Sequence, residues 1–278
     1  METETSGIPF SYTTITVTKS RIDKGLLAIP ASLMDHFPST NGYVQLSDGD
    51  GRWARKSFTA YDSSSKECRI GGMGTFYSRY HIESGDELVL HVLGKGRYQL
   101  LPEKAFREKV VDLESNFDNA PTEGEAEAAL FGLATLTRNE LDEVARSEYL
   151  RAATRDVVPR AARTRADAKS RELIPPSLRR LLASLYKGRC QVSGFSFLKR
   201  TGEPYFEVHH IDPLHGHHVK NVLVVSANVH AQFTFAEVEE SFDKAGWLRR
   251  VEFNDQPYPV FQIIDELPSV FQKEVQLA

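Results

Sequence analysis

The segment from Pro204 to Phe233 reads PYFEVHHIDPLHGHHVKNVLVVSANVHAQF, and it is the most informative part of the chain. Six of the nine histidines fall within it, between His209 and His230. Imidazole is the commonest metal ligand in proteins and the side chain that titrates nearest to neutral pH. A window this rich in histidine, with Asn221 at a fixed place inside it, indicates metal-assisted hydrolysis.

The residue pattern of this segment predicts a ββα layout. FEVHHI predicts a strand, NVLVV a second strand, and SANVHAQFTFAEVEE a helix with Ser226 as its N-cap. Neighbouring strand residues point to opposite faces, but at a frayed strand end two neighbours can line one cleft. His209 and His230 can then hold a divalent cation, while His210 takes a proton from water.

FEVHHIDP, followed by Asn221 and then by His230 nine residues later, resembles the HNH endonuclease family. The lead-in LRRLLASLYKGRC, the turn CQVSGF and the ending VHAQF are similar too, so the resemblance covers roughly the last 100 residues. It implies that His210 is the general base and that His209 and His230 are the metal ligands. It also implies that Asn221 braces the loop and orients His210 through a hydrogen bond.

The chain departs from this family at two places. Many members carry a C-x-x-C pair that binds structural zinc, whereas here Cys190 is followed by Ser193 and no second pair exists downstream. The missing pair argues against a structural zinc. The resemblance itself implies one Mg²⁺ or Mn²⁺ per active site. Phe233 stands where some relatives have a polar or basic residue. The rest of the metal shell stays open between water, a phosphate oxygen, Asn228 and Glu207.

The bulk composition is that of a soluble globular protein. The chain has 278 residues, of which 41% are hydrophobic and 26% charged, enough for two ordinary domains. No apolar stretch approaches the roughly 20 residues that span a bilayer, and METETSGIPFSY lacks the layout of a signal peptide. We therefore expect a cytoplasmic protein with no membrane partner.

Its two cysteines allow one disulfide, but free, partly buried thiols are the simpler interpretation.

The net charge of −4 is unevenly distributed. Between Asp112 and Glu148 there are ten acidic residues, opposed by Arg138 and Arg146 alone. Between Arg151 and Arg171 there are seven basic residues against two acidic ones. The basic run either follows phosphates between two domains or is a solvated helix face, and its sequence does not distinguish the two interpretations.

The composition changes along the chain in a way that predicts an α+β fold with three parts. Residues 1–102 contain short alternating runs separated by glycine-rich turns, which predicts a β-barrel or sandwich, with one short helix over Ala31–His36 after Pro30. Residues 103–172 are rich in Ala, Glu, Arg and Leu, which predicts a helical connector. Residues 173–278 are the part that resembles the HNH family, which implies a ββα-metal fold.

The front part carries a second, more dispersed resemblance. TVTKSRIDKGLLAIPASLMDHFP, then GRWARKSFTAY, then RIGGMGTFYSRYHIESGDELVLHV is similar to a DNA-binding pseudobarrel. That fold occurs in plant auxin-response-type transcription factors and in the recognition domains of some bacterial restriction endonucleases. The matching landmarks are Ile29-Pro30, Phe37-Pro38, Gly72, Phe76 and Gly85-Asp86.

In that family two strand-loop arms grip the major groove of DNA. The resemblance implies that the matching residues of this chain contact double-stranded DNA, since Arg, Lys, Ser and Thr are the side chains that bases and phosphates bind. Tyr77 and Tyr80 are as well explained by packing inside the barrel. The DNA-contacting residues predicted in this way are Lys19, Ser20, Arg21, Lys24, Arg69, Thr75, Tyr77, Ser78 and Arg79.

A recognition module joined to a metal-dependent nuclease module is the plan of a site-specific endonuclease of the type II restriction class. Cutting both strands with one site per chain requires two chains, so we expect a C2 homodimer. Its interface is expected in the acidic stretch, around Leu130, Phe131, Leu133, Leu136 and Leu141. Three alternatives stay open: an endonuclease that depends on methylated or hydroxymethylated cytosine, a DNA-binding regulator with an inactive nuclease domain, and a nuclease toxin without sequence preference.

Overall fold

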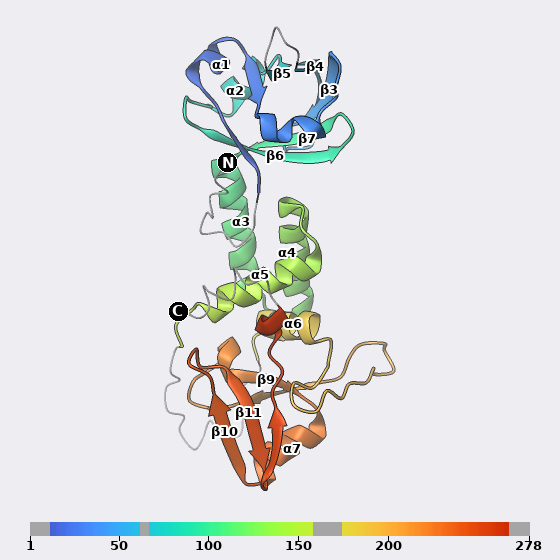
Figure 1. The fold of residues 1–278 in the computed structure, drawn as a ribbon, viewed down its shortest axis with the longest axis vertical. Helices are drawn as coiled ribbons and strands as arrows, with labels where there is room; N and C mark the ends of the chain where they lie inside the picture. The colour runs from blue at the N-terminus through green and yellow to red at the C-terminus, as the bar shows by residue number, and fades with distance from the viewer. Residues whose placement is uncertain (1–11, 62–66, 158–173, 267–278) are drawn as a thin grey trace. The chain divides into compact units, whose positions relative to one another are not determined.

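The structure is a computed structural model that describes residues 12–61, 67–157 and 174–266 (Figure 1). It divides into two compact units, and each is described by itself. The N-terminal unit comprises Met1–Asp112 with Leu136–Arg138, and the C-terminal unit comprises Leu113–Thr135 with Asn139–Ala278.

The N-terminal unit is built on one seven-stranded sheet with the strand order β1-β6-β7-β3-β4-β5-β2. Neighbouring strands pair antiparallel except β3 and β7, which are parallel. The strands are β1 (Thr14–Thr16), β2 (Leu26–Ile29), β3 (Gly42–Ser47), β4 (Trp53–Thr59), β5 (Cys68–Gly71), β6 (Glu87–Gly94) and β7 (Arg97–Pro102).

The sheet curves around a single core, which makes it barrel-like. Every strand supplies at least one buried side chain to the same cluster, from Ile15 on β1 through Val44 on β3 to Tyr98 and Leu100 on β7. A flat sheet cannot bring the inner faces of all its strands onto one cluster, so the sheet must close on itself. The end strands β1 and β2 are not neighbours in the sheet order, so the closure is incomplete.

Short helices fill the connections of this sheet. They are α1 (Lys19–Asp23), the 3₁₀ helix η1 (Ala31–His36) and α2 (Gly74–Arg79). The helix predicted over Ala31–His36 is confirmed, with Pro30 directly before its first residue. Inside the barrel, Phe37 stacks on Tyr98 with 4.2 Å between ring centres.

The C-terminal unit contains the remaining helical part of the chain. The helices are α3 (Glu103–Asp118, whose first turns belong to the N-terminal unit), α4 (Glu123–Thr137), α5 (Leu141–Ala153) and α6 (Pro176–Tyr186). Most of residues 103–153 of the predicted connector are helical, and residues 158–172 of it lie outside the described residues. However, α5 is part of the C-terminal core, where Tyr149 stacks on Trp247 with 6.1 Å between ring centres.

Two small sheets and one further helix complete this unit. β8 (Glu207–His210) pairs antiparallel with β9 (Val222–Val225), and α7 (Ala227–Phe235) follows directly. β10 (Val238–Phe242), β11 (Leu248–Phe253) and β12 (Gln256–Pro259) form a meander. The helix expected over SANVHAQFTFAEVEE therefore ends earlier than predicted, because its last five residues are in or next to a strand. The 3₁₀ helices η3 (Val219–Asn221) and η4 (Ile263–Glu266) are the other described elements.

The predicted α+β class and the barrel-like sheet are both confirmed. Within the described ranges, no helix combines the length and the apolar character needed to cross a membrane.

Candidate functional site

The β8–β9 hairpin and helix α7 place the histidines of the segment 204–233. All four residues of β9 are buried, so this strand anchors the hairpin in the core, and His209 lies opposite Leu223 on it. Ser226 caps the helix, with its Oγ accepting a hydrogen bond from Val229 N at 3.4 Å. His230 is in the first turn of α7, which brings it back toward β8.

His209 and His230 come together in the structure. Their ring centres are 5.4 Å apart, and the His209 ring also stacks on Phe233 at 4.0 Å. Phe233 follows His230 by three positions on α7, a spacing that puts both on one helix face. Burial, together with the neighbouring His230, lowers the pKa of His209 to about 4. His209 is therefore neutral at pH 7, the form in which imidazole binds metals.

A carboxylate orients His230. The Nδ1 atom of His230 donates a hydrogen bond to Oε2 of Glu207, which is on the same strand as His209. The other oxygen of Glu207 accepts a hydrogen bond of 2.6 Å from the Tyr205 hydroxyl, and this bond raises the pKa of Tyr205. The arrangement puts the lone pair of His230 on Nε2, as in the carboxylate–histidine–metal pattern of known metal sites.

His210 contacts a different partner. Its Nε2 atom lies 3.0 Å from Nδ1 of His217, and the two ring centres are 5.0 Å apart. A strand points successive side chains to opposite faces, which explains why His209 and His210 have different neighbours. The structure thus brings His209 and His230 into one pair and His210 and His217 into another.

Asn221 is buried and holds the loop that follows β8. Its Oδ1 accepts from Asp212 N at 2.8 Å, and its Nδ2 donates to the carbonyl oxygens of Asp212 at 2.7 Å and Gly216 at 2.9 Å. Ile211 N donates to Asn221 O at 3.0 Å. Both amide hydrogens of the side chain are used on loop backbone. The Asn221 amide therefore has no hydrogen left to donate to His210. It can orient His210 only indirectly, through the loop backbone.

The other histidines of the loop differ from one another in exposure and in their partners. His215 is exposed and lies 3.2 Å from Asp212. His218 is half-buried: its Nδ1 accepts from Lys220 N at 3.1 Å, so its Nε2 donates to Arg155 O, at 3.0 Å. Burial lowers the pKa of His218, which is consistent with a neutral ring that has a structural role.

The residues fit a cation site with two protein ligands. The rings of His209 and His230 are close together, and Nδ1 of His230 is bonded to Glu207, so Nε2 is the nitrogen that would bind a cation. Among the residues that the structure describes, there is no group of three or more His, Cys, Asp or Glu arranged to hold a metal ion. The remaining ligands of a cation would then come from water or substrate oxygens.

The two cysteines are buried and unpaired. Cys68 is on β5, and Cys190 accepts a hydrogen bond from Ser193 N at 3.4 Å. Hydrogen bonds around Cys190 outweigh burial and lower the pKa of its thiol. The expectation of free thiols is therefore confirmed.

The two predicted DNA-binding arms lie next to each other in the N-terminal unit. The first includes α1 and Lys24, the second includes Arg69 of β5 and helix α2. Met73 N donates to Gly25 O at 2.9 Å, which joins the arms through their backbones. Gly25 has a φ of +61°, a conformation that side chains disfavour, so glycine is needed at this turn. The exposed predicted residues are Lys19, Ser20, Lys24, Thr75, Ser78 and Arg79, whereas Arg21 and Arg69 are half-buried.

Lys19 lies 3.7 Å from Asp23, which follows it on α1, and three other predicted arm residues have partners elsewhere in the chain. Arg21 bonds Glu67 at 2.6 Å, and Arg79 bonds Asp48 at 2.8 Å. Tyr77 is packed in the core, and its hydroxyl donates to Leu26 O at 2.8 Å. Burial raises the pKa of Tyr77 to about 12, so this side chain holds the second arm in place and does not face solvent.

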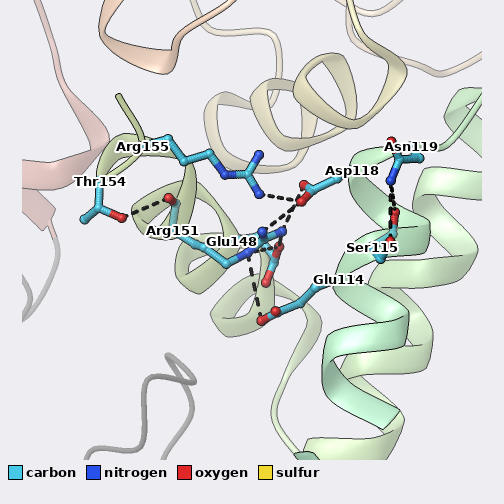
Figure 2. A network of polar contacts seen from close by, with 8 residues as sticks. All are labelled: Glu114, Ser115, Asp118, Asn119, Glu148, Arg151, Thr154 and Arg155. Carbon is cyan, nitrogen blue, oxygen red and sulfur yellow. Dashed lines mark hydrogen bonds and ion pairs between the residues drawn. The ribbon is translucent and has the colours of Figure 1, made fainter. Parts of the chain in front are cut away.

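The part of the basic run that the structure describes is neutralised. Arg151 donates two hydrogen bonds to Asp118, at 2.9 and 3.0 Å, and also bonds Glu148, while Arg155 bonds Asp118 (Figure 2). Glu114 lies 3.9 Å from the same Arg151. These two arginines therefore bind carboxylates inside the C-terminal unit. The other five basic residues of the run lie outside the described residues.

A cavity of about 270 Å³ adjoins this network and the histidine loop. Asp118, Glu148 and Arg155 line it on one side, and His217 and His218 line it on another. Its charged lining consists of Asp118, Glu148, Asp156 and Arg155.

The predicted dimer face is partly core. Leu130 and Leu133 of α4 are buried inside the C-terminal unit, whereas Phe131 is 65% exposed. Only Phe131 of these three is available to a second chain.

No family model and no curated protein matches the chain. Among solved structures it is similar to a chain of an Arabidopsis FUS3-DNA complex, at 14% sequence identity and a TM-score of 0.29, over 33% of this chain and 94% of that one. It is also similar to the N-terminal domain of Helicobacter pylori LlaJI.R1, at 12% identity and a TM-score of 0.26, over 33% of this chain and 86% of that one.

Proposed function

We propose that this protein is a metal-dependent, site-specific DNA endonuclease of the type II restriction class, with an HNH nuclease domain at its C-terminus. The observation that carries the proposal is the His209–His230 pair, with Glu207 on Nδ1 of His230. A carboxylate that orients one of two adjacent imidazoles is an arrangement that suits a divalent cation.

In this proposal His209 and His230 hold the cation, for which we expect Mg²⁺ or Mn²⁺. A bound cation would neutralise charge that develops on the leaving oxygen of a phosphodiester. Glu207 and Tyr205 keep the His230 ring in place. The cation would take its other ligands from water and phosphate oxygens, since hard divalent cations prefer oxygen.

His210 acts as the general base in this proposal. The tautomer in which its Nε2 donates to His217 puts the ring lone pair on Nδ1, and we assign proton abstraction from water to this atom. His217 then fixes the ring orientation, as a positioning residue. Asn221 keeps the loop that presents His217 attached to the end of β8.

Sequence choice is assigned to the N-terminal unit, where the exposed arm residues Lys19, Ser20, Lys24, Thr75 and Ser78 offer donors to bases and phosphates.

Each chain has one nuclease site, so cutting both strands is proposed to require a homodimer. Sedimentation of the protein with a cognate duplex tests this: one chain per duplex under cutting conditions would refute it.

The decisive experiment is digestion of unmodified phage DNA by the full chain, with Mg²⁺ and with EDTA. The proposal predicts discrete fragments that appear only with Mg²⁺. His210→Ala and His230→Ala are expected to lose cleavage by at least a hundredfold and to keep DNA binding. His36→Ala, an exposed histidine of the N-terminal unit, is the control and is expected to cut normally.

Other outcomes separate the alternatives. Fragments from methylated or hydroxymethylated DNA alone would identify a modification-dependent endonuclease. A smear of products would refute sequence choice by the N-terminal unit. Binding without cleavage of any of these DNAs, in the parent chain with Mg²⁺ or Mn²⁺, would refute the endonuclease and favour a DNA-binding regulator.

A further inference from the structure

The outer face of strands β3, β4 and β7 carries two arginines that each lie over an exposed aromatic ring. Cζ of Arg55 is 3.7 Å from the centre of the Tyr43 ring, and Cζ of Arg97 is 4.8 Å from that of Trp53. Tyr43 is 62% exposed and Trp53 43%. We call Tyr43, Gln45, Trp53, Arg55 and Arg97 the arginine–aromatic face.

The strand register puts these side chains on one side of the sheet. Gln45 of β3 lies opposite Arg55 in the antiparallel ladder and beside Arg97 in the parallel ladder. Residues paired in this way share a face of the sheet. Val44 and Leu46 alternate with Gln45 and are buried in the barrel core, so Gln45 and both arginines project outward.

The charge of this face is not compensated. Strands β3, β4 and β7 contain no aspartate or glutamate, in a chain whose net charge is −4. The two acids of the β3–β4 turn are occupied, Asp48 by Arg79 and Asp50 by the Tyr80 hydroxyl. Over the ranges that the structure describes, Arg55 and Arg97 form no ion pair.

This situation is the reverse of that in the predicted arms. There Arg21 and Arg79 are each bonded to a carboxylate, which reduces their attraction for a phosphate. An aromatic face attracts a guanidinium and restricts its motion without neutralising its charge. The donor fork of arginine matches a phosphate, so an arginine held over a ring is prepared to bind one.

We propose that the arginine–aromatic face binds the phosphodiester backbone of double-stranded DNA, as a contact separate from the two arms. Arg55 and Arg97 bind phosphate oxygens, and the Gln45 amide stands between them. The choice of DNA as the ligand rests on the proposed function, whereas the site itself rests on the geometry and charge of these three strands.

The first test measures the salt dependence of binding. The full chain is titrated into a labelled 20-base-pair duplex in EDTA, which prevents cleavage, between 50 and 200 mM salt. Loss of two phosphate contacts lowers the slope of log K against log salt by about 1.8. Between 50 and 200 mM salt the affinity of the parent for the duplex should therefore fall by about tenfold more than the affinity of the double variant Arg55→Gln with Arg97→Gln.

A matched double variant controls for net charge. Lys104→Gln with Lys109→Gln removes two exposed positive charges from α3 of the same unit, and it should keep the parent slope. Far-UV circular dichroism and thermal unfolding establish that both double variants are folded. Equal slopes for the parent and the arginine variant would overturn the proposal.

Trp53 provides a second, independent readout in the parent chain. The chain has two tryptophans, and Trp247 is buried, so acrylamide quenches mainly Trp53. Saturation with the duplex should reduce this quenching at least twofold, and Trp53→Phe should remove the effect. Unchanged quenching at saturation would overturn the proposal, because DNA would then be bound elsewhere.

These outcomes are distinguishable from failure of the proposed function. A chain that never cuts DNA but shows the slope and quenching changes refutes the nuclease and supports this face. If the chain cuts DNA, but the parent and the arginine double variant have equal salt slopes, the nuclease is supported and this face is refuted. A parent chain that does not bind the duplex at 50 mM salt refutes this face and the assignment of the arms together.

Discussion

Replacement of Glu148 by glutamine is expected to remove a pH-dependent loss of stability from the C-terminal unit. The Glu148 side chain is fully buried, and within the described structure its Oε1 has no hydrogen-bond partner. Its ion-pair partner Arg151 is shared with Asp118 and Glu114, so the positive charge is divided among three carboxylates (Figure 2). Burial raises the pKa of Glu148 to about 7 from an ordinary value of 4.5, and Arg151 opposes this rise only in part.

The sign of the effect follows from proton binding. Between pH 4.5 and 7 the folded chain holds a proton on Glu148 that the unfolded chain releases. The folded state therefore binds more protons, and its stability falls as the pH rises through this window. At about 1.4 kcal/mol per pKa unit, the fall amounts to about 3 kcal/mol. Glutamine has no proton to lose, so Glu148→Gln lacks this fall.

Trp247 makes the effect measurable in the unit that contains Glu148. Its ring stacks on Tyr149, the neighbour of Glu148 on α5. In a Trp53→Phe background, urea unfolding followed by Trp247 fluorescence at pH 5, 6, 7 and 8 reports the stability of this unit. Subtracting the Glu148→Gln profile from that of its parent cancels the titration of the histidines.

The free energy of unfolding of the parent, minus that of Glu148→Gln, should fall by about 3 kcal/mol from pH 5 to pH 8. Glu143→Gln removes an exposed carboxylate from the same helix, and its profile should run parallel to that of the parent. If the Glu148→Gln profile is also parallel, the ion pair with Arg151 outweighs burial and the reasoning is wrong.

Further substitutions test the packing of each unit. Leu182→Ala removes a fully buried side chain from the C-terminal core and should cost about 2–5 kcal/mol in urea unfolding followed by Trp247 fluorescence; a cost below about 1 kcal/mol would contradict the core assignment. Tyr98→Phe removes the hydroxyl that donates to His36 O at 2.7 Å inside the barrel, and thermal unfolding should show a loss of about 1–2 kcal/mol. Ser226→Ala removes the N-cap of α7 and should cost about 1 kcal/mol, with faster amide exchange confined to the first turn of that helix.

The elements around the histidines could be predicted from the sequence because their signals are local. The alternation in FEVHHI and the apolar run NVLVV correspond to β8 and β9, and Ser226 marks the start of α7. These patterns depend on neighbouring residues and not on distant contacts. The proximity of His209 and His230 was likewise predictable, since a ββα layout returns the helix to the first strand.

The strand β10 could not be predicted from its own residues. Val238–Phe242 contains two adjacent glutamates, which favour a helix, yet it pairs with Leu248–Phe253 of β11. Strand formation here depends on a partner further along the chain, and such pairing overrides intrinsic propensity.

The charge environment of the arginines was also beyond sequence reasoning. Arg21 and Arg79 read as free cations in the sequence, but their carboxylate partners are 46 and 31 positions away. Arg55 and Arg97 belong to no recognisable sequence motif, and only the strand register shows that they lie on one face of the sheet. The sequence thus drew attention to the neutralised arginines and missed the uncompensated ones.

The adjacency of His209 and His210 makes the register of β8 decisive for the site. A shift of one residue would exchange the faces of the two histidines, and with them the neighbours Phe233 and His217. The β9 strand VLVV is apolar and buried at every position, so it opposes such a shift only weakly. Asn221 adds four hydrogen bonds directly after β8, to Ile211, Asp212 and Gly216, and these exist in one register only. We therefore expect Asn221 to favour the register in which His209 meets His230, through its contacts with the loop backbone.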